Sequence, residues 1–291
     1  MKPRVETAEI NEGADMGSSD ARTALVTGST DGVGRLVAER LGAAGVRVLV
    51  HGRDPGRGEG VVRDIQQAGR EAEFIAADLA SLAEVRRLAA SVADRVDRLD
   101  LLINNAGVGS AGPGRQVSAD GHELRFAVNY LAGFLLTRLL LPQLRENAPA
   151  RIINVASAGQ QAIDFDDVML TRGYSGSRAY CQSKLAQILF TVDLAAELMG
   201  TGVTVNALHP ATYMNTTMVR QAGVTPWSTV EQGAEAILNL ATSAALASRS
   251  GLYFDGLREA RAQAQAYDAD ARARLRTLSF ALTGLADPAR R

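Results

Sequence analysis

Short apolar runs alternate along the chain with longer segments in which apolar residues recur at helical spacing. The strand-like runs lie at 23–26, 46–50, 73–77, 99–103, 151–155, 203–207 and 251–254. The helical segments lie at 33–44, 58–68, 81–95, 118–145 and 177–199. Parallel strands need long crossover connections, so this alternation predicts an α/β fold, a parallel sheet with helices on both faces.

No linker or repeat divides the chain, which predicts one domain over residues 21–291. Residues 1–20 are polar and acidic, and we expect this tail to be disordered. Segment 210–230 is expected to form a lid over the substrate. We expect a helical C-terminal tail over 257–291, with the charged residues of 258–276 on a solvated helix face.

The composition is that of an ordinary globular protein, with 46% hydrophobic residues, 22% charged residues and a formal net charge of -1. No basic stripe indicates a nucleic-acid partner. The single cysteine, Cys181, suits a reducing compartment. No signal peptide is expected, and the apolar window 130–144 is too short to span a bilayer. We therefore expect a cytoplasmic protein with no membrane partner. No metal site is expected, because the three histidines are scattered without ligand spacing.

A glycine-rich turn joins the first predicted strand to the first helix. Its residues are Thr27, Gly28, Ser29, Thr30, Asp31, Gly32, Val33 and Gly34. Glycines permit a tight turn and let the backbone approach a pyrophosphate, which lies at the positive end of the helix. The position of this turn between strand and helix predicts a dinucleotide site on a Rossmann-type, doubly wound sheet.

The end of the second strand, His51-Gly52-Arg53-Asp54, bears on the choice of nucleotide. An acidic residue here would bond the adenosine ribose and disfavour a 2′-phosphate. Gly52 leaves space and Arg53 can pair with a phosphate through its forked guanidinium, which favours NADP over NAD. The alternative is that Arg53 is a solvated loop residue and Asp54 takes the acidic role. Asp78, after the third strand, is placed to bond the adenine.

Lys184 is one of two lysines in the chain, and it follows Tyr180 by four residues. Residues i and i+4 share a helix face, so the ammonium can lie near the phenol. A nearby cation lowers a phenol pKa and would make Tyr180 a proton donor or acceptor near neutral pH. The alternative is a surface tyrosine packed beside a lysine stem. Cys181 is expected to pack in the core, since adjacent helical residues point to different faces.

Several motifs over residues 22–285, in the right order, resemble the short-chain dehydrogenase/reductase family. They are the glycine-rich turn, Asp78-Leu79, Asn104-Asn105-Ala106-Gly107, Asn129, Ser157 and the Tyr180/Lys184 pair. The resemblance implies a catalytic tetrad of Asn129, Ser157, Tyr180 and Lys184. It implies that Tyr180 exchanges a proton with the substrate oxygen, to which Ser157 hydrogen-bonds. Lys184 would bind the nicotinamide ribose and lower the tyrosine pKa, and Asn129 would anchor a water of the proton relay.

The resemblance also implies the residues of the cofactor site. These are Gly28, Ser29, Thr30, Asp31, Gly32, Val33, Gly34, Arg53, Asp78, Leu79, Asn105, Ala106, Gly107, Tyr180, Lys184, Pro210 and Thr212. After the sixth strand the family usually has Pro-Gly, whereas this chain has Pro210-Ala211. Alanine disfavours a positive φ, so this loop is expected to differ locally. Thr212 and Thr216 are candidate nicotinamide contacts.

The spacing of 23 residues between Ser157 and Tyr180 is longer than in the commonest members of the family. Together with the insert at 158–176 and the segments 251–254 and 265–268, it resembles the retinol-dehydrogenase-like branch. That branch often handles lipophilic alcohols and carbonyl compounds. Its membrane-bound members carry an N-terminal anchor that is not seen here, so a retinoid substrate is not implied.

We therefore expect an NADP(H)-dependent oxidoreductase that acts on a carbonyl or alcohol of a lipophilic small molecule. One alternative is a nucleotide-sugar epimerase or dehydratase on a related fold, and another is a non-catalytic NADP-sensing regulator. Tyr174 and Tyr213 flank the expected substrate mouth, where they either contact substrate or are half-buried loop residues. Trp227 lies in the expected lid.

The predicted helix 177–199 has a broad apolar surface. Its apolar residues include Leu185, Ile188, Leu189, Val192 and Ala196. A sheet can cover only one side of such a helix. In the family the matching helix often packs against a second subunit, which favours a homodimer or homotetramer. The alternative is a monomer in which the 257–291 tail covers this surface.

Overall fold

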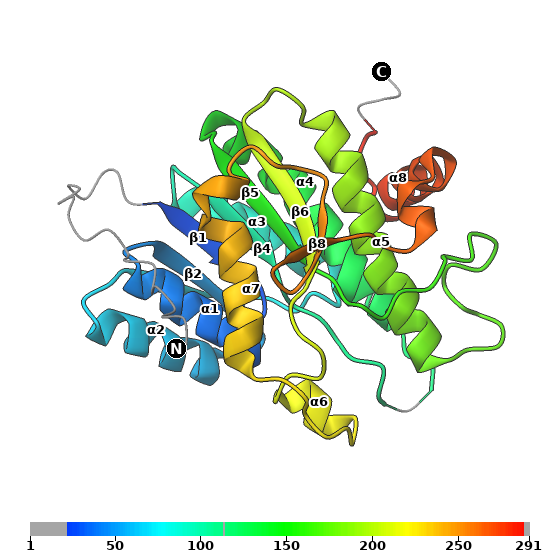
Figure 1. The fold of residues 1–291 in the computed structure, drawn as a ribbon, viewed down its shortest axis with the longest axis horizontal. Helices are drawn as coiled ribbons and strands as arrows, with labels where there is room; N and C mark the ends of the chain where they lie inside the picture. Colours follow the sequence, from blue (N-terminus) through cyan, green and yellow to red (C-terminus); the bar gives the residue numbers. More distant parts are fainter. Residues whose placement is uncertain (1–21, 113, 288–291) are drawn as a thin grey trace, which may run out of the picture.

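Eight strands form one sheet in the computed structural model, which describes residues 22–112 and 114–287 (Figure 1). The strands are β1 (Thr23–Val26), β2 (Arg47–Gly52), β3 (Ala72–Ala76), β4 (Leu101–Asn104), β5 (Ala150–Val155), β6 (Val203–His209), β7 (Tyr253–Asp255) and β8 (Arg258–Ala260). Their spatial order is β3-β2-β1-β4-β5-β6-β7-β8. The first seven run parallel, and β8 pairs antiparallel with β7. The predicted tail at 1–20 lies outside the described residues.

Helices cover both faces of the sheet. They are α1 (Gly32–Ala43), α2 (Pro55–Gln67), α3 (Leu82–Arg95), α4 (Ala132–Glu146), α5 (Gly176–Glu197), α6 (Thr217–Gln221), α7 (Val230–Thr242) and α8 (Ala269–Thr283). Helices α1, α2 and α7 pack on one face, and α3, α4 and α5 pack on the other (Figure 1). Strand β1 shows why: Leu25 points into one core while Ala24 and Val26 point into the other. The predicted single-domain, doubly wound α/β fold is confirmed.

The predicted helix at 118–145 begins too early. Val117 and Glu123 form an antiparallel bridge across a turn, and the helix starts after it with the π-helical segment η1 (Phe126–Leu131). Because Glu123 accepts a hydrogen bond from the backbone N–H of Phe126 at 2.7 Å, it caps this start. The π-helix holds Asn129, and such segments occur often at functional sites.

The sequence prediction missed helix α7 and strand β8 in the C-terminal half. Helix α7 begins at a capping box in which Thr229 and Gln232 bond each other's backbone N–H groups. The charged stretch 258–276 is only partly helical, because it begins with edge strand β8 and continues through the 3-10 turn η3 (Ala264–Tyr267) before α8. A solvated helix face was therefore a wrong expectation for the start of this stretch.

Helix α8 lies along α5 (Figure 1). Part of the apolar surface on which the homo-oligomer prediction rested is covered: Leu185, Ile188 and Leu189 are buried, whereas Val192 is half-buried and Ala196 is exposed. Phe280 of α8 meets Phe134 of α4 edge to face at 5.3 Å, and Phe134 meets Phe190 of α5 at 5.1 Å. The Arg138 guanidinium lies over all three rings at 5.1–5.9 Å. The arrangement matches the alternative in which the C-terminal tail takes the place of a second subunit. The oligomeric state itself stays a prediction.

Phe280→Ala should lower the free energy of unfolding by about 3–5 kcal/mol, because it empties a buried aromatic site and uncovers Arg138. Urea unfolding followed by circular dichroism measures this loss. Leu257→Ala, at an exposed turn position, serves as the control and should change little. A loss below about 1 kcal/mol for Phe280→Ala would show that α8 contributes little to the fold.

One helical stretch, Phe126–Glu146, is long and apolar enough to cross a membrane by length and composition alone. Most of it is buried between α3 and α5, as in the core helix of a water-soluble fold. Its apolar character is therefore explained by packing.

Candidate active site

The glycine-rich turn leaves β1 and brings its backbone very close to neighbouring loops. Gly28 has φ +64°, and a Cβ atom there would lie 2.8 Å from Cα of Ala106. A Cβ atom at Gly34 would lie 2.3 Å from the carbonyl oxygen of Gly28. Gly32 has φ +55° and opens α1, whose N-cap is Asp31. The glycines are therefore required by local geometry, and they leave the positive end of α1 facing the loop.

Side chains beneath the turn hold it in place. The Asn105 amide donates to the carbonyl oxygens of Thr27 and Gly28 at 2.8 and 3.1 Å. The Thr27 hydroxyl accepts from the N–H groups of Asn105 and Ala106 at 2.9 and 3.0 Å. Ser29 is fully buried, and its hydroxyl donates to the Val26 carbonyl at 2.7 Å. The side chains of Ser29 and Asn105, predicted to bind cofactor, therefore support the loop from within the protein.

His51 of β2 also supports this turn, a role that the sequence did not suggest. Its Nδ1 accepts a hydrogen bond from the Gly28 N–H at 3.1 Å, so the neutral ring carries its proton on Nε2. The ring is buried, and burial lowers the pKa of His51 to about 4. Nearby Ala77 and Asp78 offset only part of that effect. The histidine is thus neutral at physiological pH and acts as a fixed acceptor.

The neutral state of His51 has a consequence for stability against pH. Below the unfolded-state pKa near 6.5, His51 is protonated in the unfolded chain but stays neutral in the folded chain. The free energy of unfolding therefore falls as the pH is lowered from about 6.5 toward 4. The loss attributable to this group is on the order of 3 kcal/mol. His51→Gln should remove this contribution from the pH dependence of urea unfolding. Identical pH profiles for the two proteins would contradict the assignment.

The end of β2 differs in one respect from the prediction. A Cβ atom at Gly52 would lie 2.5 Å from the Thr30 side chain, so the space at Gly52 is filled by Thr30 and not left for a phosphate. Arg53 is exposed and its side chain is open to a ligand. Asp54 caps α2 by accepting from the Arg57 N–H at 3.1 Å. This capping bond engages the carboxylate proposed as the alternative ribose ligand.

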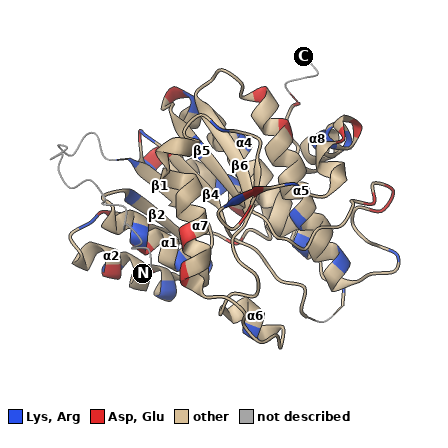
Figure 2. Cartoon of the chain, viewed as in Figure 1, with Lys and Arg blue, Asp and Glu red and all other residues tan. Residues whose placement is uncertain are grey.

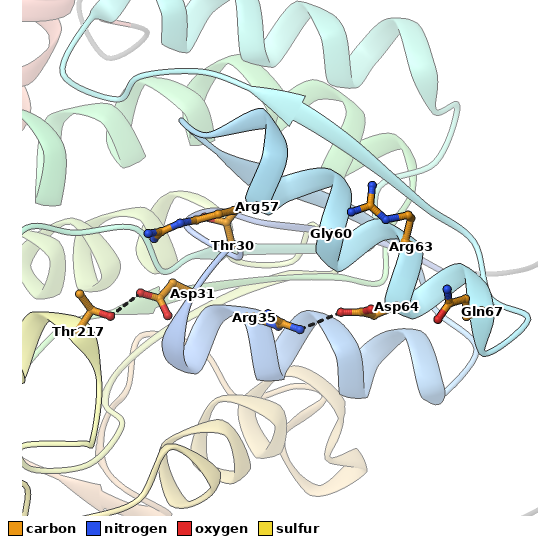
Figure 3. A pocket seen from close by; sticks show the side chains of 9 residues that line it. All are labelled: Thr30, Asp31, Arg35, Arg57, Gly60, Arg63, Asp64, Gln67 and Thr217. Atoms are coloured by element: carbon orange, nitrogen blue, oxygen red, sulfur yellow. Dashed lines mark hydrogen bonds and ion pairs between the residues drawn. The ribbon is translucent and has the colours of Figure 1, made fainter.

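A cavity of about 380 Å³ lies between α1, α2 and the glycine-rich turn (Figure 3). Its lining residues are Thr30, Asp31, Arg35, Arg57, Gly60, Arg63, Asp64, Gln67 and Thr217. Arg35 pairs with Asp64 at 2.8 Å, and the Thr217 hydroxyl donates to Asp31 at 2.7 Å. Figure 2 shows basic and acidic residues close together on α1 and α2. Three arginines against two aspartates leave an excess of positive charge.

The sequence prediction missed these arginines. Arg57 lies beside Thr30 at the edge of the turn (Figure 3), four residues after Arg53 and in the first turn of α2. The sequence does contain a signal for Arg57: Arg53 and Arg57 lie on either side of a helix N-terminus, where anions are favoured. Asp78 and Leu79 follow β3, with Leu79 buried and Asp78 partly exposed.

The four residues of the predicted tetrad come together at the carboxyl ends of β4 and β5. Asn129 and Lys184 both lie close to Gly107, which follows β4. A Cβ atom at Gly107 would lie 3.1 Å from Oδ1 of Asn129 and 3.5 Å from Nζ of Lys184. Asn129 is fixed by bonds to both backbone groups of Val108, at 2.7 and 3.1 Å. Its amide also donates to the Ser183 hydroxyl at 2.9 Å.

Ser157 and Tyr180 form the second half of the group. Their hydroxyls hydrogen-bond, and a Cβ atom at Gly159 would lie 3.5 Å from Oγ of Ser157 and 3.8 Å from the Tyr180 ring. The carbonyl oxygen of Ser157 accepts from the Tyr253 hydroxyl at 3.2 Å. The insert packs on the C-terminal segment, where Gln265 bonds both backbone groups of Ile163 at 2.6 and 3.2 Å. The long insert between Ser157 and Tyr180 thus connects the candidate active site to the C-terminal segment.

Burial dominates the electrostatics of this group. Nζ of Lys184 donates to the Val155 carbonyl at 2.8 Å and to Oε1 of Gln187 at 3.0 Å. None of these partners carries a charge, and burial lowers the pKa of Lys184 to about 7. Burial also raises the pKa of Tyr180 above its usual value, although the bond with Ser157 opposes this. Nζ lies 5.9 Å from the Tyr180 ring centre. The pKa of Tyr180 is therefore raised on balance, with desolvation as the largest cause, and the expected lowering by Lys184 stays a prediction.

The loop after β6 departs from the family pattern in a specific way. The buried Pro210 begins it, and the Thr212 hydroxyl bonds Nε2 of His209 at 3.0 Å. Ala211 does not need a positive φ, because the left-handed residue is Tyr213, with φ 45°. The positive φ in this loop is therefore found at Tyr213, two positions after Ala211. Helix α6 follows, with the Thr216 methyl 3.3 Å from a Cβ atom placed at Gly32.

The two tyrosines at the expected mouth have different surroundings. Tyr174 donates to the buried Glu123 at 3.0 Å and accepts from the buried Arg125, so it is part of a structural network. Tyr213 is 44% exposed, and its phenol contributes to raising the pKa of Tyr180. Tyr213 is the more accessible of the two, and its contact with a substrate stays a prediction. Partial burial raises the pKa of the Cys181 thiol, which argues against a nucleophilic role.

The chemistry of the site suits a dinucleotide. The glycine backbone turns tightly against neighbouring protein atoms at the N-terminus of α1, where a pyrophosphate is favoured. The cationic cavity includes Thr30 and Asp31 of this turn, and Lys184 lies at Gly107, in the loop after β4. Within 22–112 and 114–287, no group of three or more His, Cys, Asp or Glu residues could hold a metal ion.

Comparisons with known proteins agree with this geometry. Residues 22–226 match the family model described as short chain dehydrogenase. Human retinol dehydrogenase 13 is 39% identical over 93% of this chain and 87% of its own length, and human retinol dehydrogenase 14 is 36% identical over 88% and 84%. The NADP complex of Pseudomonas aeruginosa RhlG superposes with a TM-score of 0.67 at 31% identity, covering 80% of this chain and 94% of that one. The chain belongs to the short-chain dehydrogenase/reductase family of oxidoreductases, in its retinol-dehydrogenase-like branch.

Proposed function

We propose that this chain is an NADP(H)-dependent oxidoreductase that interconverts a carbonyl and an alcohol on a lipophilic small molecule. The observation that carries the proposal is the convergence of Asn129, Ser157, Tyr180 and Lys184 beside the cradle formed by the glycine-rich turn. A regulator that only senses NADP would need the cradle but not a half-buried tyrosine beside a serine.

The backbone of Gly28 to Gly34 and the α1 N-terminus would hold the pyrophosphate, and Asp78 with Leu79 would flank the adenine. Arg53 would pair with the 2′-phosphate, and Arg57 at the edge of the cationic cavity would add positive charge. Lys184 would bind the nicotinamide ribose. NADPH, when bound, supplies the hydride for reduction of the carbonyl carbon.

The protein residues handle the proton. The raised pKa of Tyr180 keeps its phenol protonated at neutral pH, which suits donation to the carbonyl oxygen during reduction. The Ser157 hydroxyl holds that oxygen within reach of the phenol. A Lys184 pKa of about 7 means that a modest change in its surroundings shifts the charge beside Tyr180. Asn129, in the π-helical segment, fixes the loop at Val108 and the Ser183 hydroxyl.

The substrate class rests on the family branch and on the apolar lid. Relatives of 35–39% identity carry the name retinol dehydrogenase, and one solved neighbour at 28% identity is a landomycin C-6 ketoreductase bound to NADP and rabelomycin. These names describe those proteins and span different compounds. We propose a lipophilic alcohol or carbonyl compound as the substrate of the present chain.

The experiment is a panel of ketones and aldehydes of rising apolar area, with oxidation of NADPH followed by absorbance. We expect turnover that increases with apolar area and that is slower with NADH. Binding of NADPH without turnover of any panel member, in both reaction directions, would favour the non-catalytic alternative.

A further inference from the structure

The lid between β6 and α7 is built on two short segments that pair with each other. The Trp227 N–H donates to the Tyr213 carbonyl at 3.0 Å, and Met214 and Ser228 form a parallel bridge. The Asn215 N–H donates to the Ser228 carbonyl at 3.1 Å. These backbone bonds hold the base of the lid in a defined shape, with one aromatic residue on each segment.

The two aromatic rings meet edge to face above this base. The ring centres of Tyr213 and Trp227 are 5.1 Å apart and the ring planes cross at 89°. Such pairs are favourable beyond the area they bury, but these rings stay 44% and 74% exposed. The pair therefore presents a large apolar surface to solvent, and Met218 of α6, 38% exposed, extends this apolar character of the lid.

The backbone at Tyr213 is strained. Its φ of 45° is rare for a bulky residue. Backbone strain of this kind is found most often at ligand sites. The segment that carries Tyr213 continues into α6, where Met218 lies against the loop after β4: a Cβ atom at Gly109 would be 2.9 Å from Cγ of Met218. The lid therefore lies over the loop that contains Gly107, beside Asn129 and Lys184. The lid from 211 to 229 contains one charged residue, Arg220, and Asn215 engages its guanidinium at 2.8 Å.

We propose that Tyr213 and Trp227 form an aromatic wall of the substrate site that selects planar, unsaturated carbonyl compounds and their alcohols over saturated ones of the same size. The inference rests on the proposed function and names its specificity-determining residues. An apolar lid alone would accept any lipophilic compound. Two rings at right angles, on a lid that lies against the loop after β4, offer both a face and an edge to a flat π-system.

The test compares 2-acetylnaphthalene with its fully saturated decalin counterpart. Wild-type kcat/KM should favour the aromatic ketone by about tenfold, the scale of an added aromatic contact. Tyr213→Leu and Trp227→Leu keep apolar bulk but remove the rings, and each should bring the ratio close to one, mainly by raising KM for the aromatic ketone. Leu257→Ala, an exposed apolar position at the β7–β8 turn, is the matched control and should keep the wild-type ratio.

Trp227 is the only tryptophan in the chain, so its fluorescence reports on the wall without turnover. Titration of the protein saturated with oxidised NADP with 2-acetylnaphthalene, a ketone that cannot react with the oxidised cofactor, should change this emission saturably, and Tyr213→Leu should weaken the apparent binding severalfold. Unchanged emission, or an equal loss for both ketones in the leucine variants, would overturn the proposal. Absence of turnover with every compound would instead defeat the proposed function, and the fluorescence titration would still test the wall.

Discussion

Tyr180→Phe should lower kcat by about 10² to 10⁴, the scale on which general acid–base groups contribute. The variant keeps the ring that packs near Gly159 and removes only the hydroxyl that bonds Ser157. The substrate oxygen would then lack its proton donor. Because the phenol is not needed to hold the pyrophosphate or the adenosine, the Kd for NADPH should stay within about twofold of wild type.

Steady-state kinetics and NADPH titration by calorimetry measure the two quantities separately. Tyr174→Phe is the matched control: it removes a phenol from the Glu123 and Arg125 network, away from the tetrad, and should leave kcat within a few-fold of wild type. Near-normal kcat in Tyr180→Phe would contradict its assignment as the acid/base.

Arg53→Ala should weaken NADPH binding by roughly 10- to 100-fold and leave NADH binding almost unchanged. A charge-assisted bond to a phosphate contributes about 1.5–3 kcal/mol, and NADH lacks the 2′-phosphate. Arg53 is exposed at the end of β2, so its loss should not affect the fold. The side chain of Asp54 is engaged by the N-terminus of α2, which limits its use as a ribose ligand.

Calorimetric titration with both cofactors decides the outcome for Arg53→Ala. Arg70→Ala, an exposed arginine beyond the end of α2, is the control for removal of one positive charge. An equal loss for NADPH and NADH, or tighter binding of NADH by the wild-type protein, would refute the role of Arg53.

The sequence was informative where local pattern decides structure. The first strand was predicted at its observed bounds because four buried residues, three of them apolar, end at a glycine turn. The family resemblance also implied that Asn129, Ser157, Tyr180 and Lys184 act together. The structure brings Asn129 and Lys184 to Gly107, and Ser157 and Tyr180 to Gly159. Motif order along the chain carried that information without any knowledge of side-chain contacts.

Tertiary context explains what the sequence could not predict. Helix α7 is an exception, since its capping box and its buried apolar face can both be read from the sequence. The space at Gly52 is filled by Thr30, a contact between β2 and the turn that no local pattern encodes. The direction of the Tyr180 pKa depends on the balance between burial and charge, and burial is set by the whole fold.

The central claim is that hydride passes between NADP(H) and a bound carbonyl or alcohol at the tetrad. The direct measurement uses NADPH that carries deuterium on the transferring face of the reactive nicotinamide carbon, with 2-acetylnaphthalene as acceptor and mass spectrometry of the product. The account predicts one deuterium on the carbinol carbon of the alcohol from one face of the nicotinamide, and loss of this product in Tyr180→Phe. An alcohol product without deuterium, whichever face of the nicotinamide carries the label, would contradict the account. So would the absence of both ketone reduction and alcohol oxidation with every compound of the panel.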